Sequence, residues 1–279
     1  MAKIKKPEDE MSFLDHLEAL RWHIIRATLA VAIAATVAFF LKSFIFDFLL
    51  FGPTHSDFWT YDMLCRISNA VGVDGGFCDT TMPFKIQSRT MGGQFSAHIW
   101  VAITAGFVIA FPYVLWEFWK FVAPAMKEKE KKHAKSFLFV SSFLFFIGVL
   151  FGYYVITPLS INFLGKYQVS SEVLNQFDLE SYISLVRASV LASGLIFELP
   201  IVIFFLTRLG VITPDFLKKY RKYALIIVLT ISAIITPPDI VSQIIVAIPV
   251  LLLYEVSIFI AQVVYKQELK KQKELRKRP

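Results

Sequence analysis

The stretch PYVLWEFWKFVAPAMKEKEKKHAK, residues Pro112 to Lys135, marks the point where an apolar chain meets a charged aqueous surface. Apolar runs flank it, from Phe95 to Trp116 upstream and from Phe137 to Ile156 downstream. Tryptophans favour the headgroup layer of a bilayer, and lysines in short loops mark its cytoplasmic side. The stretch therefore predicts a short cytoplasmic loop between two membrane-spanning helices.

Composition places the chain among integral membrane proteins. Of its 279 residues, 56% are hydrophobic and 28 are phenylalanine, whereas soluble domains contain about 45–50% apolar residues. The net charge of +7 fits basic loops that face anionic lipid, and no groove pattern of aromatic and basic residues indicates nucleic acid binding. The first apolar run ends without a small-residue cleavage motif, so we expect it to stay as a membrane anchor.

Six apolar segments predict an all-α integral membrane protein with six transmembrane helices and both termini in the cytoplasm. Lysine and arginine concentrate in the N-terminal segment, the 117–135 and 208–222 loops and the tail, as the positive-inside rule requires. The fifth segment, Tyr223–Ile235, would form a helix shorter than the roughly 30 Å thickness of the hydrocarbon core. The expected helices are Trp22–Leu41, Phe95–Glu117, Phe137–Ile156, Tyr182–Thr207, Tyr223–Ile235 and Ile240–Val264.

A single membrane domain over residues 1–279 is expected. Apolar residues near helical spacing in Ser12–Arg21 predict a separate amphipathic helix lying on the membrane. Pro112 is expected to kink the second spanning helix, and Pro158 to end the third. The expected parts are a cytoplasmic N-terminus over 1–21, a six-helix bundle over 22–264 with an external loop over 42–94, and a basic cytoplasmic tail over 265–279, disordered or lying on the membrane.

Both cysteines, Cys65 and Cys78, fall in the expected external loop. In an oxidising compartment they could form a disulfide worth on the order of 3 kcal/mol in the loop-entropy model. The alternative is a pair of free thiols. Their spacing is not of the CxxC type, so neither a metal site nor a cofactor is expected.

Glu198 is the sharpest candidate for a functional group inside the membrane. It lies in GLIFELPIVIFF, Gly194 to Phe205, with apolar residues on both sides. A carboxylate at such depth costs at least about 2.5 kcal/mol, and Pro200 frees a backbone carbonyl nearby. The alternative is a protonated glutamic acid that bonds a neighbouring helix.

Two other carboxylates, Glu18 and Glu130, are expected at the cytoplasmic face. A carboxylate there can hold a guanidinium through two hydrogen bonds, and the alternative for each is a solvated surface charge. The sequence contains no HExxH motif, phosphate-binding glycine loop or Walker-type lysine. We therefore do not expect an enzyme.

Four motifs together resemble TatC, the multispanning core of the twin-arginine protein translocase, and the resemblance covers nearly the whole chain. The motifs are SFLDHLEALR at Ser12–Arg21, FPYVLWEFWKFVAPAMKEKE at Phe111–Glu130, FELP at Phe197–Pro200 and TPPDIVSQ at Thr236–Gln243. The resemblance implies a receptor and scaffold in the bacterial cytoplasmic (inner) membrane. Such a protein binds twin-arginine signal peptides of folded precursors and recruits TatA-type and TatB-type single-helix partners for export driven by the proton motive force.

The resemblance also implies site residues. Many relatives have a glutamate where this chain has Ala19, and Glu18 stands one place earlier, a rotation of about 100° around a helix. The implied residues are Glu130, Glu18, Arg21, Leu20, Phe121, Pro124 and Pro112 for the signal peptide, Glu198 as the intramembrane glutamate, Thr236 and Gln243 for docking a partner helix, and Asp239 as the external acidic residue.

The expected architecture is a concave helical scaffold with a short fifth helix. The chain is expected to act as a homo-oligomer within a hetero-oligomeric complex in the bilayer. The alternative function is a proton-coupled small-solute transporter that uses Glu198 as its proton carrier. No internal repeat is visible in the sequence, which counts against that class.

Overall fold

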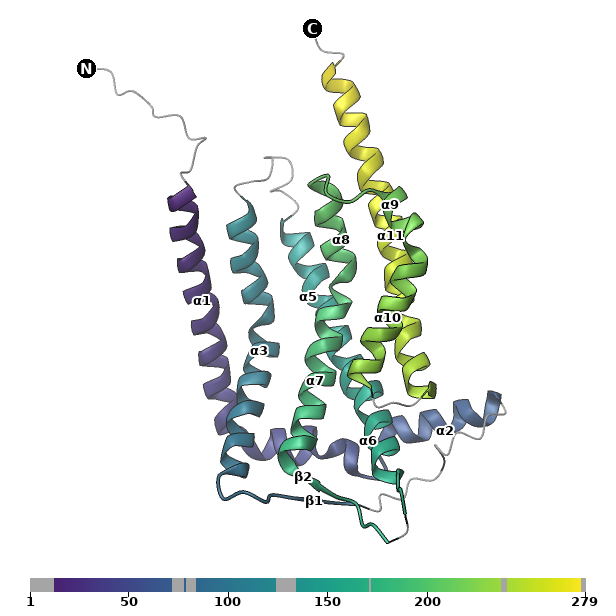
Figure 1. Cartoon of the computed structure of the whole chain (residues 1–279). Helices are drawn as coiled ribbons and strands as arrows, with labels where there is room; N and C mark the ends of the chain where they lie inside the picture. Colours follow the sequence, from purple (N-terminus) through teal and green to yellow (C-terminus); the bar gives the residue numbers. More distant parts are fainter. Residues whose placement is uncertain are drawn as a thin grey trace, which may run out of the picture. The chain divides into compact units, whose positions relative to one another are not determined.

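The computed structural model describes residues 13–71, 78, 84–123, 134–170, 172–236 and 240–276, and these are mostly helical (Figure 1). The chain divides into two compact units. The first comprises the described parts of residues 1–40 and 102–142, and the second those of residues 41–101 and 143–279.

Five helices in the described part of the chain are long and apolar enough to cross a membrane. The remaining expected segment forms α10 (Arg221–Ile235), whose 15 residues reach only about 22 Å. The expectation of a short fifth helix therefore agrees with the length of α10. The five long segments are Leu17–Phe40, Gly93–Val122, Phe137–Lys166, Leu179–Arg208 and Ser242–Lys270.

The first unit contains α1 (Phe13–Phe40), the second half of α3 (Gly93–Val122) and the start of α5 (Ala134–Phe151). The separate surface helix expected over residues 12–21 is not present in the described chain. Residues 13–40 form one helix instead, since no glycine or proline interrupts them. A Cβ atom added to Gly106 would lie 2.5 Å from the backbone nitrogen of Ala35, so α1 and α3 approach backbone to backbone.

The third spanning helix differs from its prediction. The expectation that Pro158 ends it was wrong, because α5 continues through the π-helical turn η4 (Gly152–Ile156) into α6 (Thr157–Lys166). Pro158 lies in the first turn of α6, where a missing N–H is tolerated. Side chains bond carbonyls of the π turn: Thr60 Oγ1 donates to the Tyr154 oxygen at 2.6 Å, and Thr157 Oγ1 to that of Gly152 at 2.9 Å.

Small residues bring α5 and η4 against α7 (Leu179–Phe197) in the second unit. A Cβ atom on Gly148 would lie 2.6 Å from the carbonyl oxygen of Ser193. One on Gly152 would overlap the Ser193 hydroxyl and lie 2.5 Å from the Ser189 carbonyl oxygen. These helices therefore pack with almost no side chain between them.

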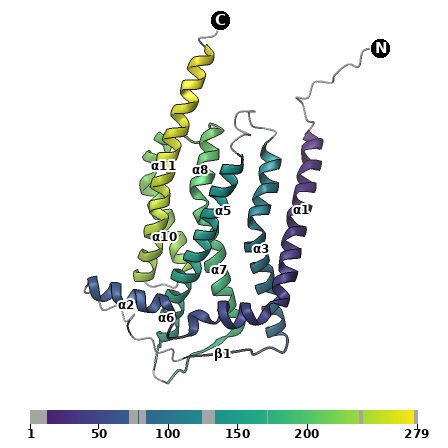
Figure 2. The same ribbon diagram turned by 180° about the vertical axis from the view of Figure 1, so that it is seen from behind.

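Residues 42–94, expected as a loop, contain several ordered elements. Tyr61 is buried among them, its hydroxyl donates to the Pro53 carbonyl at 2.7 Å, and burial raises its pKa well above the ordinary value. Figure 2 shows α2 beside α6 and not parallel to α7 or α11. The elements are η1 (Phe44–Leu50), η2 (Gly52–Thr54), α2 (Trp59–Val71) and β1 (Lys85–Gln87), which pairs in parallel with β2 (Gln176–Asp178), Lys85 opposite Gln176.

The last helices of the second unit pack around α11 (Ile240–Arg276), which Figure 1 shows beside α8 (Leu199–Arg208) and α10. The short helix α9 (Pro214–Lys219) contributes Leu217 to the same core. The tail, expected to be disordered or on the membrane, is helical as far as Arg276, because its Lys, Glu, Gln and Leu residues favour helix. The buried members of this core are Ile203, Leu217, Ile258 and Ala261.

Candidate functional site

A buried carboxylate in the first unit is surrounded by basic side chains. Glu117 of α3 is 1% exposed, and its Oε2 lies 2.7 Å from His23 Nδ1 of α1. Lys120 Nζ donates to Glu117 Oε1 at 2.9 Å, and Arg26 Nη1 lies 3.9 Å from Oε2. A carboxylate this deep requires a partner, and the cluster supplies partners from two helices.

Helical spacing positions each member of this cluster. His23 and Arg26 are three residues apart on α1, as are Glu117 and Lys120 on α3, and such pairs share one face of a helix. Lys120 also lies over the Trp116 ring, with Nζ 5.3 Å from its centroid.

Phe121, a predicted recognition residue, packs against the same cluster. Its ring meets that of His23 edge to face, with centroids 6.2 Å apart. Sequence reasoning did not single out Glu117 or His23. The available signal was a carboxylate between Trp116 and Phe118 at the end of an apolar run, with Lys120 three residues on.

The predicted α1 residues Glu18, Leu20 and Arg21 lie five, three and two residues before His23, about half a turn to one and a half turns along the helix. Glu18 and Arg21 are exposed, whereas Ala19 and Leu20 are half-buried. Two charged side chains at the start of α1 are therefore accessible to an aqueous ligand.

Two residues predicted to bind the signal peptide, Pro124 and Glu130, lie outside the described residues. Pro112 lies inside α3, half-buried, and the helix runs through it without a break from Gly93 to Val122.

Glu198 lies where one helix gives way to the next. It follows α7 and precedes α8, and Pro200 occupies the first turn of α8. The Glu198 side chain is 8% exposed. A continuous fourth helix was expected, but the structure interrupts the regular α-helix at the residue that carries the carboxylate.

The residues predicted to dock a partner helix bond to the backbone of their own chain. Thr236 is buried, and its hydroxyl donates to the Ser232 carbonyl at 2.8 Å. Gln243 Nε2 donates to the Leu229 carbonyl at 3.0 Å, which ties the start of α11 to α10. Asp239 lies outside the described residues.

In the second unit, Cys65 and Cys78 form a disulfide. Arg187 of α7 lies with its guanidinium carbon 4.7 Å from the centroid of the Trp100 ring. Within the described residues, no group of three or more His, Cys, Asp or Glu side chains could hold a metal ion.

These features define a multi-pass helical membrane protein with ionisable groups set into its spanning helices. The sequence model of the family described as "Sec-independent protein translocase protein (TatC)" matches residues 15–249. The chain belongs to the TatC family.

Relatives and solved structures agree with this assignment. A TatC protein of Blattabacterium sp. is 40% identical over 95% of this chain and 100% of the relative. One of Aquifex aeolicus is 32% identical over 96% of this chain and 100% of the relative. A crystal structure described as the twin-arginine translocase receptor TatC has a TM-score of 0.66 and 32% identity, covering 89% of this chain and 99% of that chain. A second, in the detergent DDM, has a TM-score of 0.68 and 33% identity, covering 88% and 99%.

Proposed function

We propose that this chain is the receptor and scaffold subunit of a twin-arginine translocase, which binds the signal peptides of folded precursor proteins. The likeness to a crystal structure described as the twin-arginine translocase receptor, at 32% identity and over 99% of that chain, carries the proposal. The work of such a subunit is binding and scaffolding, without a catalytic step. The relatives are likewise named as translocase components.

In this proposal the chain is a single membrane domain in the bacterial cytoplasmic membrane, with six spans and both termini in the cytoplasm. Five spans correspond to the long apolar helices and the sixth to α10. Because α10 is shorter than the hydrocarbon core, the bilayer thins there or flanking residues enter it.

The two arginines of a signal peptide bind to Glu130, with Glu18 assisting, in the geometry that carboxylates offer to guanidinium groups. The exposure of Glu18 and Arg21 at the start of α1 supports this placement. The other residues proposed to bind the signal peptide, next to these carboxylates, are Leu20, Phe121, Pro124 and Pro112.

The apolar part of the signal inserts towards Glu198, whose burial at a helix junction supports a role inside the membrane. Thr236 and Gln243, beside the short α10, form the docking patch for TatA-type and TatB-type single-helix partners, with Asp239 as the acidic residue at that turn. The partners and the proton motive force complete the transport step, and the chain works as a homo-oligomer within the larger complex.

Binding of fluorescent signal peptides to the detergent-solubilised protein tests the receptor role. We expect a peptide with Arg-Arg to bind at least about tenfold more tightly than its Lys-Lys counterpart, a difference of about 1.4 kcal/mol. Equal binding of the two peptides contradicts the proposal.

Charge reversal in the loop tests the residue assignment. Glu130→Lys is expected to abolish export of a twin-arginine cargo at normal protein abundance, whereas Glu128→Lys, two residues earlier in the same loop, leaves export near the parent level. Normal export by Glu130→Lys removes Glu130 from the site. A solute transporter, the alternative function, would instead take up solute in vesicles that contain this protein alone.

A further inference from the structure

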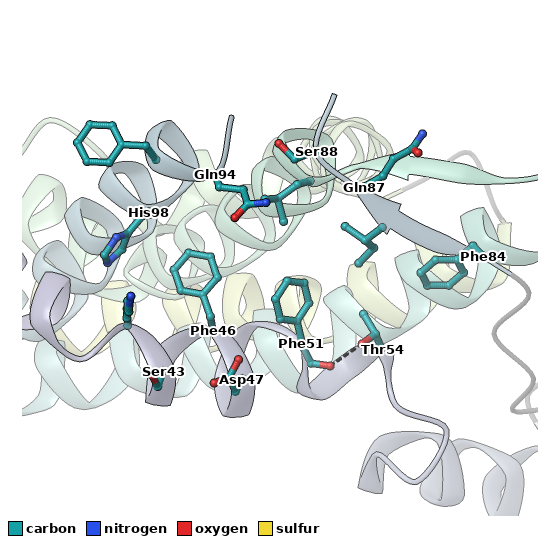
Figure 3. Close-up of a pocket in the computed structure, with 14 residues that line it drawn as sticks. Ser43, Phe46, Asp47, Phe51, Thr54, Phe84, Gln87, Ser88, Gln94 and His98 are labelled. Carbon is teal, nitrogen blue, oxygen red and sulfur yellow. Dashed lines mark hydrogen bonds between the residues drawn. The ribbon is translucent and has the colours of Figure 1, made fainter. Parts of the chain in front are cut away.

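A large open cavity lies in the second unit at the Lys42 end of the long helices (Figure 3). Its volume is about 910 Å³, near the upper end of the roughly 300–1,000 Å³ range of small-molecule sites. Its walls come from η1, from the segment around β1, from the first turns of α3 and from Leu179 at the start of α7. None of its lining residues belongs to the signal-binding residues proposed above.

One part of the lining is aromatic and apolar. In Figure 3 the rings of Phe46, in η1, and of Phe51, the residue that follows η1, extend towards the segment that carries Ser88 and Gln87. Phe84 lies at one end of the cavity beneath the same segment. A hydrocarbon chain can pack against these rings, whereas a wholly polar solute would leave them exposed to water.

Another part of the lining carries charges of both signs. Lys42 supplies a cation and Asp47 a carboxylate five residues later on the same segment. His98 contributes a ring nitrogen from α3, and its ring stands edge-on to Phe46 with centroids 5.6 Å apart. Ser43, Ser88 and Gln94 add neutral hydrogen-bonding groups. An occupant that carries both a phosphate and a cation would find a partner for each.

The position of the cavity along the spanning segments sets its depth. Lys42 follows the span that ends at Phe40, and Gln94 is the second residue of the span that begins at Gly93. The cavity therefore lies at the level where hydrocarbon gives way to lipid headgroups.

We propose that this cavity binds the headgroup of a zwitterionic phospholipid with a primary ammonium, phosphatidylethanolamine. Its phosphate lies towards Lys42 and His98, its ammonium donates hydrogen bonds to Asp47, and its acyl chains begin along the Phe46 and Phe51 rings. Asp47 disfavours an anionic headgroup without an ammonium, because two negative groups would then share the site. A choline headgroup has no N–H to donate to the carboxylate.

Lipid retention by the reconstituted full chain tests the proposal. The protein is placed in vesicles of equal parts phosphatidylethanolamine and phosphatidylglycerol and extracted in mild detergent, and the bound lipids are counted by native mass spectrometry. We expect phosphatidylethanolamine to be retained about tenfold over phosphatidylglycerol, the scale of one charge-assisted hydrogen bond. Lys42→Gln is expected to lower retention of both lipids.

The Asp47 variants separate headgroup recognition from general lipid adhesion. Asp47→Asn is expected to remove the preference, Asp47→Glu to keep it, and Asp57→Asn, an exposed aspartate in a nearby turn outside the cavity, to leave it unchanged. Equal retention of the two lipids by the parent protein, or a preference that survives Asp47→Asn, overturns the proposal. Displacement of the lipid by equimolar soluble glycerophosphoethanolamine assigns the site to free phosphate esters and overturns the lipid assignment. None of these readouts needs a signal peptide.

Discussion

His23 Nδ1 and Glu117 Oε2 lie 2.7 Å apart and join two helices through residues separated by 94 positions in the sequence. The side chains of this cluster differ in their exposure to solvent. Glu117 is 1% exposed, whereas His23 is 18% and Lys120 42% exposed. Water can solvate the basic side chains if their partner is lost, but it cannot reach the carboxylate. Removing the carboxylate and removing its basic partners are therefore expected to lower the stability of the protein by different amounts.

Removing two of the basic side chains is predicted to cost more than removing the acid. The double variant His23→Leu with Lys120→Met takes the two closest basic partners from a buried carboxylate, and a loss of about 3–5 kcal/mol is expected. Glu117→Gln alone leaves basic side chains that water reaches, so its loss is expected to be smaller. Thermal unfolding in detergent measures both.

A rescue experiment isolates the charge effect from lost packing. Adding Glu117→Gln to the double variant removes the unpaired charge, so part of the lost stability is expected to return. A triple variant less stable than the double variant would show that packing, not charge, holds α1 against α3.

Glu18, and not position 19, is predicted to contact the signal peptide. Glu18 is exposed while Ala19 is half-buried, so Glu18→Gln is expected to weaken binding of an Arg-Arg peptide by up to about tenfold, or 1.4 kcal/mol. Ala19→Ser, which adds no charge, serves as the control. Unchanged affinity in Glu18→Gln would leave Glu130 to hold both arginines.

The contact between η4 and α7 is predicted to reject any side chain at Gly152. Gly152→Ala puts a methyl group onto the Ser193 hydroxyl and the Ser189 carbonyl, and overpacking of this kind costs about 1–3 kcal/mol. Gly92→Ala is a matched control, because nothing lies within 4 Å of the added Cβ there. Equal unfolding temperatures for the two variants would mean that the helices separate easily.

The disulfide is predicted to stabilise the region around α2 without affecting signal binding. Cys65 and Cys78 are separated by 13 residues, which corresponds to about 3 kcal/mol in the loop-entropy model. A reductant should lower the unfolding temperature of the parent protein but not that of the Cys65→Ser, Cys78→Ser double variant. A signal-peptide affinity that falls with reduction would connect this region to the receptor site.

Local composition was sufficient to predict the long membrane-spanning helices. Long apolar runs predicted the five spans because a bilayer excludes polar side chains over roughly 20 residues, and the length of α10 agrees with a short fifth helix. The prediction at Pro158 failed, because a preceding π-helical turn places this proline in the first turn of a new helix. Residues 13–40 form one helix because they include no glycine or proline, the two residues with the lowest helix propensity.

The sequence by itself determined that the chain is an apolar, helical membrane protein, and its motifs alone pointed to the TatC family. Only the tertiary structure decided that Glu117 is buried and that His23, from another helix, is one of its partners. It also decided that Lys42, Asp47 and His98 line one cavity. Hydrophobicity is a local property that accumulates along a run of residues, whereas a buried ion pair depends on which helices pack together and in what register.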